Sequence, residues 1–318
     1  LLMFLSGFEI ELEIFEDKGI KQLAAPFIIF LGTLSLSLLV VNYFEYDLFL
    51  ALVLGTTSVG IVVPILRADE KIKTTYGQII FLSALLADFL TLILATVYAS
   101  VVKTDGFTLN NLNVVLYFIV IFLLLRLLRR AAWWYPDLFK RLFDANDPEE
   151  MGIRGSLALM LSVVGLSVLF DIEPILGAFL AGTIFALVFP NRGSLDISMK
   201  GFSYGFLIPI FFINVGLNYD IQILTNTTFY LEVLILFCLA IFVKLVPSLF
   251  MYFFGIKIRD IFAGGLLLSA RFSLIIAMAE IGLELGLLSQ KVESEIIFLA
   301  ALTATFAPIG YKFFSIKK

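Results

Sequence analysis

The chain has 318 residues, of which 61% are hydrophobic and 15% are charged, and its mean hydropathy is +1.04. This composition lies far outside that of soluble domains and predicts an all-α polytopic membrane protein. The formal net charge of -4 says little about partners, because the asymmetry between loops matters more in a membrane protein. Histidine, CxxC, Walker and GxGxxG patterns are absent from the sequence. We therefore expect no zinc, haem or nucleotide site, no cofactor and no nucleic-acid partner, with membrane lipid as the surroundings.

Apolar runs of about 17 to 25 residues recur along the chain, separated by short polar or Gly/Pro-containing joints. The eleven membrane segments that they predict are 1–15, 24–43, 47–66, 76–101, 112–130, 154–170, 174–190, 203–218, 228–254, 260–285 and 293–314. The first run begins at Leu1 without an initiator methionine, so we expect that some N-terminal sequence is missing. No soluble domain of useful length is expected within these residues.

The basic residues are distributed unequally between the joints on the two sides of the membrane. If successive joints alternate sides, one side holds eighteen of the twenty-two Lys and Arg residues. The other side holds Lys103 and Lys291, whereas Lys244 and Arg271 fall inside segments. The positive-inside rule assigns the richer side to the cytoplasm. We therefore expect a multi-pass protein of the cell (inner) membrane, with the N-terminus outside and the C-terminus in the cytoplasm.

An aspartate, Asp88, lies about midway along the apolar run from Tyr76 to Val101. An ionised carboxylate at the centre of a bilayer costs several kcal/mol, so it is usually neutral, paired, or facing a wet cavity. Asp88 is therefore the first candidate for a functional residue. The alternative is a buried, hydrogen-bonded carboxyl group that is permanently protonated.

Two of the predicted segments are poorly suited to being plain helices. Gly55–Pro64 places two glycines, three hydroxyl side chains and a proline in one span, and Gly264–Arg271 places small residues and a charge at mid-depth. Non-helical backbone at membrane depth survives only where protein or a water-filled cavity satisfies it. The two segments run in opposite directions, which is typical of an inverted-repeat transporter with its site at their crossing. The alternative is close helix packing through small residues.

Two basic residues lie too deep to reach the membrane surface easily. Lys244 is about ten residues, or about 15 Å, from the cytoplasmic end of its segment, so it needs an internal partner. Asp88 is the expected partner, with Arg271 as a competitor for it. Arg271 carries a fixed charge that neutralises carbonyl ends of broken helices or pairs with an acid such as Glu280.

Six strings of residues, in this order, resemble those of monovalent cation:proton antiporters, in the branch of the Kef-type potassium exchangers and the sodium/proton exchangers. The strings are Phe4–Glu11, Thr56–Leu66, Leu85–Asp88, Leu176–Gly182, Pro209–Leu217 and Ser269–Ser273. The resemblance extends over almost the whole chain. It implies a single transmembrane antiporter domain (1–318, the sodium/hydrogen exchanger domain) of thirteen helices with inverted repeats, of which eleven are present here. It also implies a homodimer in which a core domain moves against a dimerisation domain, with core-type segments near 47–101 and 228–285.

The resemblance also assigns the site. It makes Asp88 the ion-binding aspartate, Lys244 its lysine partner in some members, and Arg271 the arginine found in the second broken helix of others. The position before the aspartate, an acid, Asn or Gln in much of the family, is Ala87 here. One polar ligand is therefore missing. Many Kef-type proteins carry a regulatory nucleotide-binding domain after the membrane domain, and none is expected within residues 1–318.

The expected function is exchange of Na⁺ or K⁺ for protons, with Asp88 binding the proton or the monovalent cation in turn. Oxygens of Thr56, Thr57 and Ser58 complete the cation's shell in this hypothesis. The further polar candidates for the pathway are Ser83, Asn214 and Glu280. One proton moves per cation if Lys244 keeps its proton, and two move if it releases one. The alternatives are a sodium-coupled organic-anion symporter and a non-transporting membrane sensor on the same fold. The lack of a nucleophile and base pair disfavours an intramembrane enzyme.

Overall fold

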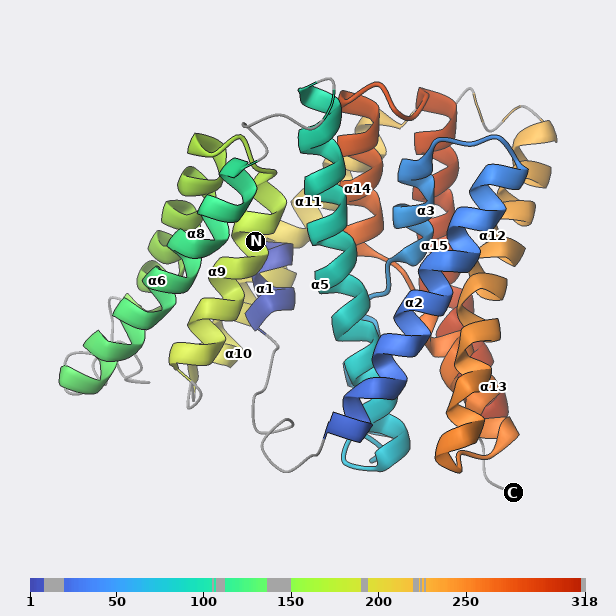
Figure 1. Cartoon of the computed structure of the whole chain (residues 1–318), viewed down its shortest axis with the longest axis horizontal. Coiled ribbons are helices and arrows are strands. Elements are labelled where there is room, and N and C mark those ends of the chain that lie inside the picture. The colour runs from blue at the N-terminus through green and yellow to red at the C-terminus, as the bar shows by residue number, and fades with distance from the viewer. Residues whose placement is uncertain are drawn as a thin grey trace. The chain divides into compact units, whose positions relative to one another are not determined.

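The computed structural model describes residues 1–8, 20–104, 106, 112–135, 150–189, 194–219, 223, 225 and 227–315. Over these residues the chain is helical and holds no strand, which confirms the expected all-α class (Figure 1). The chain divides into two compact units. Unit 1 comprises Leu1–Glu16 and Ala99–Tyr219, and unit 2 comprises Asp17–Tyr98 and Asp220–Lys318.

Unit 1 is built around a buried apolar helix, α9, which packs against α1, α8 and α6. Gly7 of α1 and Gly182 of α9 mark the closest approach in this unit. A Cβ atom on Gly182 would overlap the carbonyl oxygen of Phe4, and one on Gly7 would overlap that of Phe179. Only glycine at both positions lets the two backbones come this close. The helices of unit 1 are α1 (Leu2–Phe8), α6 (Leu112–Trp134), α8 (Met151–Leu169), α9 (Pro174–Val188), α10 (Ser194–Phe202), the π-helical turn η3 (Ser203–Leu207) and α11 (Ile208–Asn218).

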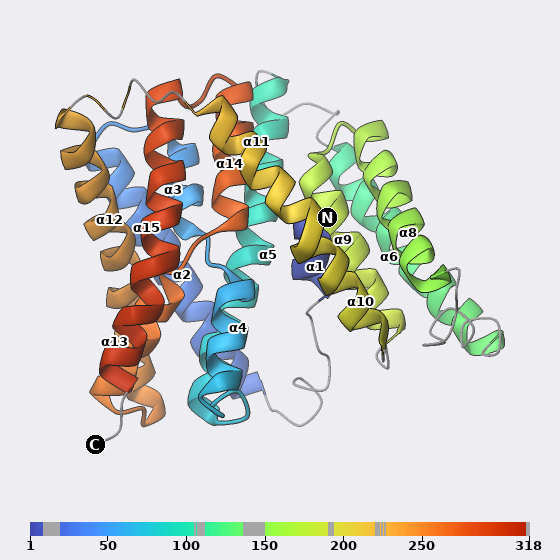
Figure 2. The same ribbon diagram turned by 180° about the vertical axis from the view of Figure 1, so that it is seen from behind.

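Unit 2 holds the two interrupted spans that the sequence predicts. α13 packs against both α12 and α15, and α2 packs against α3 and α12 (Figure 2). The helices of unit 2 are α2 (Ile20–Tyr43), α3 (Leu48–Gly55), α4 (Val59–Ala68), α12 (Thr227–Ser248), the 3₁₀ turn η5 (Leu249–Phe254), α13 (Ile258–Leu268), α14 (Ser273–Glu284) and α15 (Gln290–Ser315). The long α5 (Thr75–Lys103) belongs to unit 2 as far as Tyr98.

Each expected membrane segment contains helix within the described residues. Eight helical spans there are long and apolar enough to cross a membrane, or nine if α13 and α14 form one bent span. The shorter α9 has 15 residues, and α1 is described only over Leu2–Phe8, because the rest of the first expected segment lies outside the described residues. The expected count of eleven spans therefore stays a prediction.

Candidate functional site

The first interrupted span stops being helical between Gly55 and Val59. α3 begins at an N-cap, Asp47, whose carboxylate accepts a hydrogen bond from the backbone N–H of Phe49 (2.7 Å), and it ends at Gly55. Thr56 and Ser58 have extended backbone conformations (φ -61°, ψ 158° and φ -109°, ψ 106°), and α4 then starts at Val59. The break exposes carbonyl groups at the end of α3 and N–H groups at the start of α4 that need partners in the protein.

The second interrupted span supplies some of these partners. α13 ends at Leu268, α14 begins at Ser273, and the two are bent by 45°. The backbone N–H of Ser58 donates to the carbonyl oxygen of Ala270 (2.8 Å), and the hydroxyl of Thr57 donates to that of Leu268 (3.0 Å). The two breaks therefore meet in unit 2 and satisfy each other's backbone groups, as the sequence predicts.

Lys244 projects from α12 to the end of α3. Its ammonium donates to the carbonyl oxygen of Gly55 (2.5 Å) and to the hydroxyl oxygen of Thr57 (2.8 Å), and its side chain is buried. Asp88 is close enough for its charge to act on the ammonium. Lys244 thus has internal partners, as expected, but those described here are the C-terminal carbonyl of α3 and the hydroxyl of Thr57. A direct ion pair between Lys244 and Asp88 stays a prediction.

Arg271 binds backbone carbonyls from three elements. Its guanidinium donates to Leu54 of α3 (2.6 Å), Ala240 of α12 (3.1 Å) and Ser269 at the second break (3.1 Å), and no part of the side chain is exposed. The carbonyl oxygen of Arg271 accepts a hydrogen bond from the hydroxyl of Thr303 on α15 (3.4 Å). These contacts fit the first of the two expected roles, neutralisation of the carbonyl ends of broken helices.

Asp88 lies at the opposite kind of helix end. Its Oδ2 atom accepts a hydrogen bond from the backbone N–H of Val59, the first residue of α4, at 3.4 Å, and the residue is 5% exposed. The aspartate therefore faces the partial positive charge of an N-terminus, while the two cations face the partial negative charge of C-termini. The first break, between Gly55 and Val59, therefore has buried cations at the end of α3 and a buried carboxylate at the start of α4.

Two of the candidate hydroxyl groups donate their hydrogens to backbone carbonyls of their own helices, so their oxygens remain free to accept. Thr56 donates to the carbonyl of Val53 (2.8 Å), and Ser83 donates to that of Ile79 (2.7 Å). Thr56, Thr57, Ser58 and Ser83 are all buried. A hydroxyl oxygen retains lone pairs when its hydrogen is used, so these groups remain able to contact a cation.

Glu280 lies apart from this arrangement. It is an exposed residue of α14 beside Glu293, seven residues, or about 10 Å, from the start of that helix at the break. Asn214 is an exposed residue of α11, which belongs to unit 1, so its place in an ion pathway stays a prediction.

Comparisons with known proteins show sequence similarity along nearly the whole chain. A family model described as "Sodium/hydrogen exchanger, transmembrane" matches residues 1–317. YjbQ of Bacillus subtilis, which bears the name of an Na(+)/H(+) antiporter, is 34% identical in an alignment of 339 residues that covers 98% of this chain. The Na(+)/H(+)-K(+) antiporter GerN of Bacillus cereus is 28% identical in an alignment of 320 residues that also covers 98% of this chain. The Na(+)/H(+) antiporter of Enterococcus hirae is 24% identical in an alignment of 327 residues that covers the whole of this chain.

The same matches cover different shares of the relatives. The chain spans about half of YjbQ (52%), 80% of GerN and 83% of the Enterococcus hirae protein. All three alignments run through the region that contains both interrupted spans, because they include nearly every residue of this chain.

Proposed function

Because this chain belongs to the sodium/hydrogen exchanger family, we propose that the protein exchanges a monovalent cation, Na⁺ or K⁺, for protons across a membrane. Asp88 binds the proton and the cation in turn. The observation that carries the proposal is a buried carboxylate at the start of α4, where two interrupted spans meet. The names of the relatives support cation:proton exchange and give no support to organic-anion symport or to a sensor.

Competition for one carboxylate is sufficient for exchange. A partly dehydrated Na⁺ or K⁺ ion binds the ionised carboxylate of Asp88, with oxygens of Thr56, Thr57 and Ser58 and nearby backbone completing its shell. When a proton binds the carboxyl group of Asp88, the group loses its negative charge and no longer attracts the cation. The proton and the cation therefore cannot be bound at the same time, which couples the transport of one to the transport of the other.

The two buried cations supply the fixed part of the site. Arg271 keeps its charge and holds the carbonyl ends together, so the breaks keep their shape when Asp88 changes its ligand. Lys244 holds Gly55, the last residue of α3, and Thr57 within the first break. Movement of one proton per cation follows if Lys244 stays charged throughout, and two protons move if cation binding displaces its proton.

The proposal extends to the setting of the protein. The excess of Lys and Arg in alternate joints supports a multi-pass cell-membrane protein with the ends of α4 and α15 facing the cytoplasm and the starts of α3, α12 and α15 facing outward. The chain acts as one transmembrane antiporter domain, in which the segments near 47–101 and 228–285 form the core. It functions as a homodimer in membrane lipid, as the family resemblance implies.

Cation-induced proton movement in proteoliposomes tests the proposal. The purified protein is reconstituted with a pH-sensitive dye, and pulses of Na⁺ or K⁺ are applied to wild type, Asp88→Asn and a control variant, Asp171→Asn. Asp171 is exposed and has a positive φ of 57°, a conformation that asparagine accepts readily. We expect a response in wild type and in the control and none in Asp88→Asn.

Each outcome has a clear meaning. The cation that evokes the response is the transported ion. Wild-type exchange in Asp88→Asn would remove Asp88 from the site, and the lack of any response in folded wild-type protein would remove the proposed activity.

A further inference from the structure

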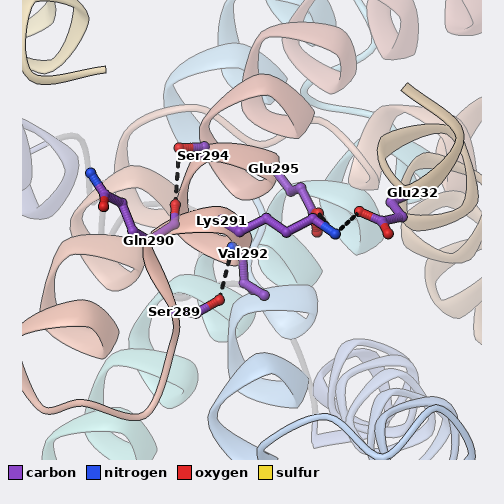
Figure 3. Close-up of polar contacts among 7 residues, drawn as sticks. All are labelled: Glu232, Ser289, Gln290, Lys291, Val292, Ser294 and Glu295. Atoms are coloured by element: carbon purple, nitrogen blue, oxygen red, sulfur yellow. Dashed lines mark hydrogen bonds and ion pairs between the residues drawn. The ribbon is translucent and has the colours of Figure 1, made fainter. Parts of the chain in front are cut away.

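A second group of charged side chains lies at the ends of α12 and α15, outside the Asp88 site (Figure 3). The ammonium of Lys291, on α15, is 2.5 Å from Oε2 of Glu232, on α12, and 3.8 Å from Oε1 of Glu295, one turn further along α15. Glu232 is twelve residues before Lys244 on the same helix, a separation of about 18 Å. The group is therefore separate from the Asp88 site, although both belong to unit 2.

The three side chains differ in their access to water. The side chain of Glu295 is 2% exposed, whereas those of Glu232 and Lys291 are 33% and 48% exposed. Both carboxyl groups nevertheless lie within 4 Å of the same ammonium, that of Lys291. Glu232 is therefore the carboxyl group of this pair that water reaches, and Glu295 is the one that the protein shields.

The charges within the group do not balance. Two carboxylates share one ammonium, and a negative charge on the buried Glu295 has only a partner 3.8 Å away. Tyr46, in the connection between α2 and α3, adds no positive charge. Burial, and then the charges of Glu295 and Glu232, raise the pKa of Tyr46, so its phenol stays neutral.

Other acidic and basic groups on the neighbouring helices face elsewhere. Glu293, also on α15, lies beside Glu280 of α14. Asp47 caps the start of α3. Asp260, in the first turn of α13, lies near Tyr311 in the last turns of α15, at the opposite end of that helix. The excess negative charge of the group therefore remains for a ligand to neutralise.

We propose that Glu232, Lys291 and Glu295 form a proton-binding site in which the two carboxyl groups share one proton. The proton sits on one carboxyl oxygen and is donated to an oxygen of the other carboxylate, which leaves a single negative charge for Lys291 to balance. A metal cation fits less well, because the ammonium of Lys291 is already close to both carboxylates. Under the topology proposed above, this site takes its proton from the outer aqueous phase.

The position of the site links it to the exchange machinery. The contact between Glu232 and Lys291 ties α12 to α15. α12 carries Lys244, and α15 carries Thr303, whose hydroxyl binds the backbone of Arg271. Loss of the shared proton adds a second negative charge beside the contact between Glu232 and Lys291. The outer pH therefore affects α12 and α15, the two helices whose side chains contact the breaks. This consequence for transport rests on the proposed function, but proton binding itself does not.

Infrared difference spectroscopy during a pH titration tests proton binding without relying on transport. The carboxylic-acid C=O band is followed in an Asp88→Asn background, so that Asp88 does not contribute. The band is compared in this background with and without Glu295→Gln, Glu232→Gln, Lys291→Met or the control Glu284→Gln, which changes an exposed residue of α14. We expect a protonated carboxyl that titrates above the value of about 4.3 for an exposed glutamate.

The variants make the outcome decisive. Glu295→Gln and Glu232→Gln each remove the band, the control keeps it, and Lys291→Met moves its midpoint to higher pH because the competing ammonium is gone. Persistence of the full band in both glutamine variants, or titration of both acids at about pH 4.3, overturns the proposal. In wild type that exchanges cations, Glu295→Gln also shifts the outer-pH profile of exchange by about one unit. If wild type fails to exchange cations, the infrared result still decides proton binding.

Discussion

The ammonium of Lys244 donates a 2.5 Å hydrogen bond to the carbonyl oxygen of Gly55, which lies 189 residues earlier in the chain. Gly55 is the last residue of α3, so a lysine on a distant helix donates to a carbonyl at the C-terminal end of an interrupted span. This contact satisfies a carbonyl that lipid cannot, and it places a positive charge where the helix dipole favours one.

Lys244→Met should weaken the fold as well as the transport. The substitution keeps much of the side-chain volume but removes the donors to Gly55 and Thr57, and it should lower the free energy of unfolding by about 3 kcal/mol. Denaturant unfolding in detergent measures this loss. The control is Lys103→Met, which breaks a half-exposed ion pair with Glu173 (2.8 Å) that is worth about 0 to 1 kcal/mol. Equal losses in the two variants would contradict this role of Lys244.

Thr57→Val should cost more stability than Thr56→Val. The hydroxyl of Thr57 donates to Leu268 and accepts from Lys244, so it connects three elements, whereas the hydroxyl of Thr56 donates only within its own turn, to Val53. We expect a loss of about 1 to 3 kcal/mol for Thr57→Val, because a buried donor and acceptor lose their partner. Thermal unfolding of both variants in the same detergent measures the difference, and a larger effect at Thr56 would argue against the contact between the breaks.

Arg271→Lys should fail to replace the arginine despite the same charge. The planar guanidinium reaches carbonyls of Leu54, Ala240 and Ser269 at once, and a lysine ammonium is a compact group that does not reproduce this fork. Each carbonyl left without a donor costs about 1 to 3 kcal/mol. The yield of monodisperse protein on size-exclusion chromatography should fall in Arg271→Lys and further in Arg271→Leu. Wild-type yield in Arg271→Leu would show that the carbonyls find other donors.

Glycine-to-alanine substitutions should have opposite effects at two positions of unit 1. A Cβ atom on Gly182 overlaps the backbone of Phe4, so Gly182→Ala must separate α1 from α9 and should cost about 1 to 3 kcal/mol. Gly165, in α8, has open space around its Cα, so Gly165→Ala should add about 0.5 to 1 kcal/mol through the helix propensity of alanine. The melting temperatures of the two variants measure the contrast. A stabilised Gly182→Ala would show that α1 and α9 do not approach each other so closely.

Much of unit 2 follows from composition and spacing. The glycines, hydroxyls and proline between Gly55 and Pro64 predict an interrupted span, and charge at mid-depth singles out Asp88, Lys244 and Arg271. Polar residues inside apolar runs are costly and therefore conspicuous, so this part of the site can be found without coordinates.

The partners of these residues are harder to foresee. Arg271 and Lys244 bind backbone carbonyls, and every residue carries a carbonyl, so the sequence does not mark Leu54 or Ala240 as ligands. The pairing of Glu232 with Lys291 is equally hidden, because it joins two helices whose relative rotation the sequence does not specify. The spacing of Lys291 and Glu295 at i,i+4, with the acid inside an apolar segment, is the signal that could have indicated that group.

The contact between the two breaks also bears on how the chain is made. The hydroxyl of Thr57 finds its acceptor 211 residues later, and the N–H of Ser58 must likewise wait for Ala270. At about 5 to 20 residues per second, translation needs on the order of ten to forty seconds to supply that partner. During this interval the nascent α3 and α4 hold polar backbone that lipid cannot satisfy. The first break is therefore a part of the chain whose backbone can be completed only after most of the protein has been synthesised.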